Sequence, residues 1–310
     1  MVIDNPPDFS YSRGLDRRSL LLEAAERLDD LENHLGPGDS TKAESVAAQQ
    51  IRAFADDEAE FADIPTMYKI TEQYFLQLPD KTVPYSFKQL AARNDFYWLD
   101  ITINLHPKTK WAFNQIRVDI EFNPYAPKDG TRPKAYQIFP DEQFVEYMKV
   151  HAQAQVGLDA NLNLVAQLPS IHIPAATAPL PIITDLSAGV GTKNNLSLGF
   201  EIPPHILSLK ADKITHAPPM LEKVWWELHG KEFSREHRPL LSVIVQVPKG
   251  TREFKIRGEM DVARSFKYAP ANLREAIEDL PAKFRELFQK GAPIHVKTPE
   301  DSPWDMTRFL

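Results

Sequence analysis

The sequence predicts an α+β fold that is mainly β, with an antiparallel β-sandwich-like core of about nine strands. Apolar residues in the first 93 positions recur at intervals of three and four, which indicates an N-terminal helical region. Beyond Asn94 they alternate with polar residues, and few alternating segments are separated by a helix, which favours antiparallel pairing. A last apolar stripe indicates a closing C-terminal helix. The predicted regions are a helical region at 1–93, a β-rich domain at 94–268 with a long hairpin at 152–202, a helix at 269–291 and an extended tail at 292–310.

Two helices are expected at the start of the chain. Leu21, Ala24 and Leu28 begin a single apolar stripe over 15–35, and the Gly-Pro-Gly run after it ends the helix. A second helix is predicted from Thr41, which forms a capping-box pair with Glu44. Further helices are predicted over 66–78 and 86–93.

The strands of the central region are predicted from a period of two. The segments "WLDITINLHP", "NQIRVDIEFNP", "PKAYQIFP" and "VWWEL" are expected to be half-buried strands. The segments "LLSVIVQVPKG" and "REFKIRGEMDVARSF" are predicted to form a hairpin around Pro248, Lys249 and Gly250. A short helix is expected from Pro140 to about Met148. Two segments, "ITINLHPKTKWAFNQIRVDI" and "VIVQVPKGTREFKIRGEMDV", resemble each other, as a duplicated strand pair would.

The closing helix carries its own signals. Asn272 and Glu275 form a predicted capping box, and Pro281 is expected to kink the helix. Gly291 is expected to end it.

Composition excludes several function classes. The chain has no Cys, so disulfides, Cys-zinc sites and a Cys nucleophile are excluded. A net charge of −7 and a pI near 5.8 argue against binding to a nucleic-acid backbone. Mean hydropathy is −0.38, and we expect neither a membrane-spanning helix nor a signal peptide. The predicted location is the cytoplasm, with release without a leader left open.

Catalytic signals are weak. Three potential zinc ligands lie close together in sequence: His229, Glu232 and His237. However, Gly230 and Pro239 favour a loop, and the spacing differs from the H-E-x-x-H zinc motif. We therefore predict no metal and no cofactor, and keep these three residues as candidates for a hydrolase site assembled only by folding.

The acidic run of Asp56, Asp57, Glu58 and Glu60 is typical of a solvated helix end. Trp225 and Trp226 are expected to point to opposite faces of a strand, one into the core and one towards the surface.

The segment 152–202 is unusual because it alternates but carries almost no charge. Its 51 residues hold only four charged side chains, whereas 25% of the chain is charged. Burying the four Leu and one Val of its first arm would contribute about 8–15 kcal/mol as an upper estimate, comparable with the stability of a typical domain. The predicted interaction residues are Val156, Leu158, Leu162, Leu164, Leu168, Leu186, Val190, Leu196, Leu198, Phe200, Trp225 and Trp226.

The sequence does not decide what buries the apolar face of this segment: the protein's own core, another subunit, or lipid. The sequence favours a non-enzymatic structural or protein-interaction protein that assembles, with a protein partner or with copies of itself, through the 152–202 hairpin. A pore-forming or membrane-inserting protein that uses the same hairpin is the alternative. A hydrolase with a spatially assembled His/Glu site is a further alternative.

Overall fold

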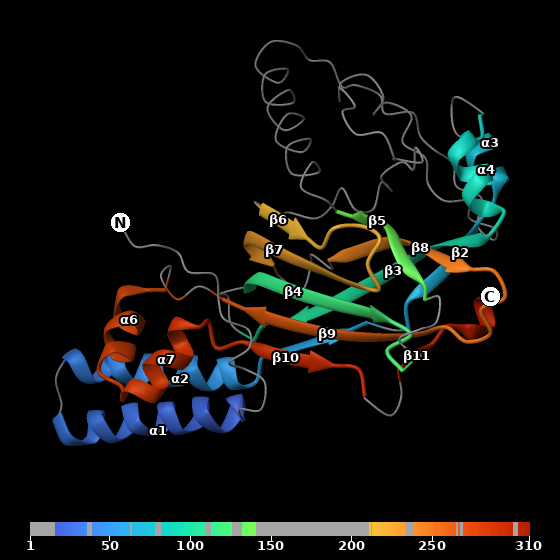
Figure 1. Cartoon of the computed structure of the whole chain (residues 1–310). Coiled ribbons are helices and arrows are strands. Elements are labelled where there is room, and N and C mark those ends of the chain that lie inside the picture. The colour runs from blue at the N-terminus through green and yellow to red at the C-terminus, as the bar shows by residue number, and fades with distance from the viewer. Residues whose placement is uncertain are drawn as a thin grey trace, which may run out of the picture.

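The protein is a β-sandwich with a helical unit at one end (Figure 1). The computed structural model describes residues 16–35, 39–62, 64–77, 82–108, 113–125, 132–140, 211, 213–233, 239–264, 266, 269–299 and 303–310. These residues form two antiparallel sheets and eleven strands, which confirms the predicted mainly-β α+β class and exceeds the expected number of strands. The predicted helix at 140–148 and the 152–202 hairpin lie outside the described residues.

The first sheet has five strands and is built around its longest member, β3. Its order is β1-β3-β8-β5, and β2 also pairs with β3. Leu99, Ile101 and Ile103 of β3 face the core, while the residues between them face outwards. The strands are β1 (Glu58–Phe61), β2 (Thr66–Ile70), β3 (Asn94–His106), β5 (Lys134–Phe139) and β8 (Leu240–Pro248).

The second sheet has six strands and packs against the first. Its order is β10-β9-β4-β7-β6, and β11 also pairs with β9. Ile116, Val118 and Ile120 of the central strand β4 are fully buried between the sheets. The strands are β4 (Phe113–Phe122), β6 (Lys213–His216), β7 (Lys223–Phe233), β9 (Lys255–Ala263), β10 (Ile294–Lys297) and β11 (Trp304–Asp305).

The chain crosses from the first sheet to the second three times, from β3 to β4, from β5 to β6 and from β8 to β9. The predicted hairpin around Pro248 is therefore wrong, because β8 pairs with β3 and β5 whereas β9 pairs with β4, β10 and β11. Alternation shows that both strands bury one face, but it does not distinguish neighbouring strands from strands that face each other across a core. The two similar sequence segments pair with each other, β3 with β8 and β4 with β9.

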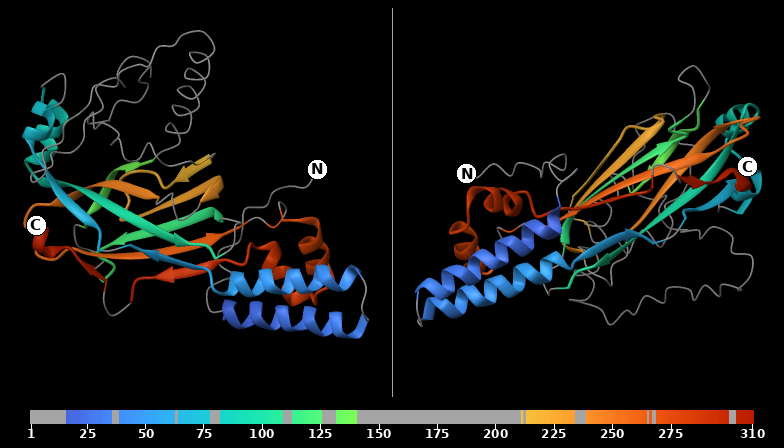
Figure 2. Two further views of the ribbon diagram at one scale, coloured as in Figure 1. Left: turned by 180° about the vertical axis from the view of Figure 1, so that it is seen from behind. Right: turned by 90° about the horizontal axis from the view of Figure 1, so that it is seen from below.

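Four helices form a second hydrophobic core beyond one end of the sandwich, and the C-terminus lies at the other end (Figure 2). Helix α2 begins at Asp39, before the predicted Thr41. The N-cap of α6 is Pro270, so the predicted Asn272 cap is wrong. The N-cap of α7 is Pro281, which therefore separates two helices where a kink in one helix was predicted. Proline suits this position because a helix start needs no N–H there. The helices are α1 (Arg17–Leu35), α2 (Asp39–Ala55), α6 (Ala271–Glu278) and α7 (Ala282–Gln289).

Two other predictions need correction. Residues 66–70 form strand β2, and only α3 (Glu72–Gln77) is helical in the predicted 66–78 helix. Pairing with β3 along its whole length explains the strand. The tail 292–310 supplies β10, β11 and the 3-10 helix η5 (Thr307–Phe309), and Trp304 packs edge-on against Phe61 of β1. The predicted helix at 86–93 corresponds to α4 (Tyr85–Ala91).

Two glycines offer a matched test of packing at the C-terminus of α7. Gly291 has φ +84°, and an added Cβ would lie 2.7 Å from the Arg264 carbonyl oxygen, whereas Gly250 has φ +85° with nothing within 4 Å. Gly250→Ala should cost about 1–2 kcal/mol of unfolding free energy for the left-handed backbone alone. Gly291→Ala should cost about 1–3 kcal/mol more through overpacking. Urea unfolding of both variants measures the difference, and equal losses would show that the close approach at Gly291 contributes nothing.

Candidate functional site

The outer face of the six-stranded sheet carries a row of polar side chains, one from each of five neighbouring strands. Strand register places Thr215 beside Glu227, Glu227 beside Arg117, Arg117 beside Asp261 and Asp261 beside His295. These residues alternate with core positions along their strands, so they share the face away from the core. We call these five residues the polar row.

The carboxylates of the polar row contact histidine and arginine side chains. Nε2 of His229 lies 2.8 Å from Oε1 of Glu227, and Nδ1 of His295 lies 2.8 Å from Oδ1 of Asp261. Nη1 of Arg117 lies 3.9 Å from Oε2 of Glu227. The hydrogen bond with His229 lowers the pKa of Glu227 and outweighs burial, which acts in the opposite direction.

The two tryptophans point to opposite faces of β7, as the strand geometry requires. Trp226 is fully buried, and its Nε1 has no hydrogen-bond partner. Trp225 is half-buried on the outer face, where the Arg117 guanidinium lies 5.2 Å from its ring centroid. Trp225 is therefore the tryptophan within reach of a partner, although Arg117 already covers part of its ring.

The structure describes only part of the predicted His/Glu cluster. His229 lies in β7 next to the polar row, Glu232 belongs to the same strand but its side chain is outside the description, and His237 lies outside the described residues. The predicted loop is wrong as far as Phe233, because β7 pairs with β4 and β6. No group of three or more metal-ligating side chains occurs among the residues that the structure covers.

A His–carboxylate pair can act as a general base when a substrate proton lies within hydrogen-bond reach. Within the described chain, the imidazoles of His229 and His295 are hydrogen-bonded only to carboxylates. Neither ring has a serine, threonine or tyrosine hydroxyl as a partner there, so the polar row presents no activated nucleophile.

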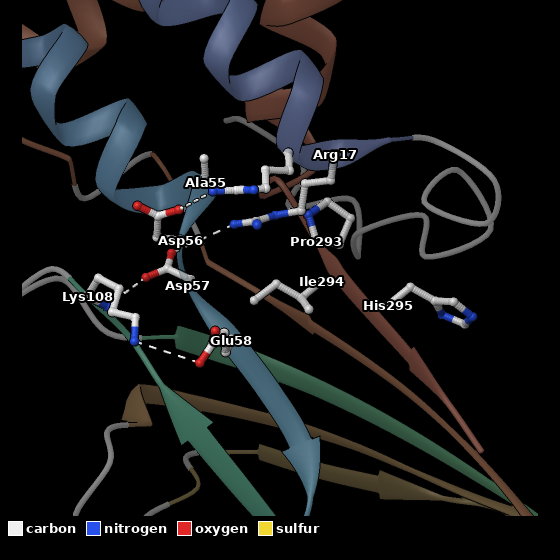
Figure 3. Close-up of a pocket in the computed structure, with 10 residues that line it drawn as sticks. Arg17, Ala55, Asp56, Asp57, Glu58, Lys108, Pro293, Ile294 and His295 are labelled. Atoms are coloured by element: carbon white, nitrogen blue, oxygen red, sulfur yellow. Dashed lines mark hydrogen bonds and ion pairs between the residues drawn. The ribbon is translucent and has the colours of Figure 1, made fainter. Parts of the chain in front are cut away.

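A cavity of about 730 Å³ lies where the helical unit meets the sandwich (Figure 3). It opens between the start of α1, the turn from α2 to β1 and the start of β10. Figure 3 shows Arg17 and Asp57 turned towards each other, and His295 directed away from them. The lining residues are Arg17, Arg18, Ala55, Asp56, Asp57, Glu58, Lys108, Pro293, Ile294 and His295.

A buried ion-pair cluster adjoins this cavity, and its members Arg17 and Asp57 line it. Nη1 of Arg264 donates to Oδ2 of Asp57, and the two side chains are 1% and 0% exposed. Nη2 of Arg17 lies 3.7 Å from the same oxygen, and the Lys108 amide donates to Oδ1 at 2.7 Å. The Arg264 guanidinium lies between the rings of Phe54 and Phe113, at 4.5 and 4.6 Å from their centroids.

Sequence reasoning missed this cluster. Asp57 is buried, so the prediction of a solvated acidic run is wrong for this residue, although Asp56, Glu58 and Glu60 are exposed. One signal was present: Arg264 continues the core-facing alternation of Met260 and Val262, so the pattern itself places an arginine inside. A buried arginine requires a carboxylate partner. Which carboxylate it meets depends on contacts between segments far apart in the chain, because Asp57 and Arg264 are separated by 207 positions.

No protein-family model matches this chain, and no curated protein matches it. No helix among the described residues is long and apolar enough to cross a membrane.

Glu227→Gln tests the polar row through pH. Because the pKa of Glu227 is lowered in the folded protein, its contribution is present above the ordinary value of 4.5 and is lost as pH falls below it. The variant should lose about 1 kcal/mol of unfolding free energy at pH 7, a modest amount because the pair is partly exposed. It should lose nothing in strong acid, because Glu227 is then protonated in both the folded and the unfolded chain. Urea midpoints against pH measure this, with the exposed Glu278→Gln as control. A loss independent of pH would contradict the assignment.

Asp57→Asn tests the buried cluster. It leaves two guanidinium groups without a carboxylate and should cost about 3–5 kcal/mol of unfolding free energy. Arg264→Met should cost less, because Asp57 keeps Arg17 and the Lys108 amide and the methionine still packs between the rings. Asp56→Asn, next in sequence but exposed, is the matched control and should change stability by less than about 0.5 kcal/mol. Equal losses at positions 56 and 57 in chemical denaturation would contradict the cluster's role.

Proposed function

We propose that this protein is a non-enzymatic structural or interaction protein that assembles with copies of itself through the low-charge segment 152–202. The sandwich serves as its rigid support. The observation that carries the proposal is where the long insertion joins the fold. The chain leaves the first sheet after β5, which ends at Phe139, and returns in the second sheet at β6, which begins at Lys213. Each is a terminal strand of its sheet, and the two lie on the same side of the sandwich (Figure 1).

Main-chain hydrogen bonds join β5 to the segment that connects β6 to β7. Ala135 of β5 donates its N–H to the carbonyl of Leu221 at 2.9 Å and accepts from the N–H of Met220 at 2.6 Å. The segment that follows β6 thus docks onto β5. An ion pair between Arg132 and Glu222, 3.2 Å apart, strengthens the same junction. Such a junction supports an inserted segment without any rearrangement of the two sheets.

The composition of the insertion supports self-assembly. Its alternating positions hold Leu and Val, while the intervening positions are mostly Gln, Asn, Ser and Gly. Neutral polar faces of this kind avoid the charge repulsion that opposes pairing between identical chains. The imidazoles of His229 and His295 support a non-catalytic role, because within the described residues neither is paired with a serine, threonine or tyrosine hydroxyl.

Replacing residues 152–202 by a short Gly/Ser linker should convert an oligomer into a monomer that still unfolds cooperatively. Size-exclusion chromatography with light scattering across a range of concentrations measures this. Two outcomes would overturn the proposal: a strictly monomeric full chain, or an oligomer that survives the replacement. Dye release from vesicles by the full chain, but not by the shortened one, would instead favour the membrane-inserting alternative.

A matched pair of substitutions separates the faces of the segment. Leu162→Glu lies on the apolar alternation and should weaken association by about 10–100-fold, the equivalent of losing one buried leucine. Asn163→Glu adds the same charge one position along and should have a smaller effect. Equal weakening by both would show that net charge, not the apolar face, governs assembly.

A further inference from the structure

The cavity at the junction of helices and sandwich carries an unbalanced positive charge at its base. Asp57 is shared by two guanidinium groups, those of Arg264 and Arg17, while its second oxygen accepts from a backbone amide. One carboxylate therefore faces two buried or nearly buried cations. A buried charge without a counter-ion is costly, so this arrangement favours an added anion.

The ion-pair cluster also holds donors that have no acceptor. Nε and Nη2 of Arg264 are buried and have no hydrogen-bond partner, but Arg264 itself is not among the residues that line the cavity. Arg17 donates Nε to the carbonyl of Ala292 at 2.8 Å and Nη2 to that of Phe54 at 2.5 Å. Its Nη1 has no partner among the described residues, and Arg17 lines the cavity. Burial, with the charge of Arg264, lowers the pKa of Arg17 to about 10, so this group remains cationic at neutral pH.

The rim supplies two more cations that are only loosely held. Nη2 of Arg18 lies 3.1 Å from Asp56, and Nζ of Lys108 lies 3.7 Å from Glu58. All four side chains are about half exposed or more, and such surface pairs contribute little. Arg18 and Lys108 can therefore turn towards a ligand at small cost.

We propose that this cavity binds a small molecule through an oxyanion group, a carboxylate or a phosphate, that Arg17 contacts directly and that Arg18 and Lys108 cover from the rim. A guanidinium group matches the geometry of both oxyanions. The volume of about 730 Å³ is typical of small-molecule sites and exceeds what a bare ion needs.

Calorimetric titration of the full chain with inorganic phosphate, acetate and succinate, at ionic strength matched with KCl, tests the proposal. Saturable binding of at least one is expected, and the arm that binds identifies the group. Arg17→Gln should weaken that binding by about 10–100-fold, and Arg18→Gln by a smaller factor. Arg274→Gln, at an exposed arginine of α6 outside the cavity, should leave it unchanged.

If Arg17→Gln does not fold, the double variant Arg18→Gln, Lys108→Gln decides the matter, because both side chains lie at the surface. It should weaken binding by about tenfold with an unchanged thermal unfolding midpoint in KCl. Absence of saturable binding in all three arms would overturn the proposal. Binding of equal strength in the wild-type chain and the cavity variants would do the same. Neither result depends on the state of assembly, so this test is independent of the proposed function.

Discussion

The buried ion pair between Asp57 and Arg264 is the interaction on which the rest of the structure depends. The protein has two hydrophobic cores, one between the sheets and one among the helices, and they meet at this pair. Phe54 of the helical core and Phe113 of the sandwich core enclose the guanidinium from either side. Replacing such a pair by apolar residues is often neutral, whereas removing one partner is costly. Its main effect is therefore to specify how helices and sandwich join.

The same joint links several distant parts of the chain. Arg17 brings the start of α1 to Asp57, and the backbone of Arg264 donates to the carbonyl of Gly291 at the end of α7. The cavity exists because these segments converge without filling the space between them. The polar row lies on the outer face of the second sheet and meets the cavity at His295, which belongs to both.

Particular residues show how far sequence patterns reach. The alternation of β3, β4 and β7 predicted their strands, and it also placed Trp225 and Trp226 on opposite faces. It did not distinguish adjacent strands from facing ones, so the β8–β9 hairpin was wrong. The prediction that Asp57 is solvated was wrong for a related reason. Within an acidic run, nothing local distinguishes the carboxylate that pairs with a buried arginine from those that face water. His229 and Glu227 sit close in sequence, yet their contact depends on a strand, not the expected loop.

Local periodicity therefore determined the class of the fold, the main strands and helices, and which face of each is apolar, because these depend on residues two to four positions apart. Only the tertiary structure decided which sheet each strand joins, which carboxylate receives Arg264, and where the cavity opens. Those outcomes depend on contacts between residues far apart in the chain, such as the 207 positions between Asp57 and Arg264. A single sequence carries no direct record of such contacts.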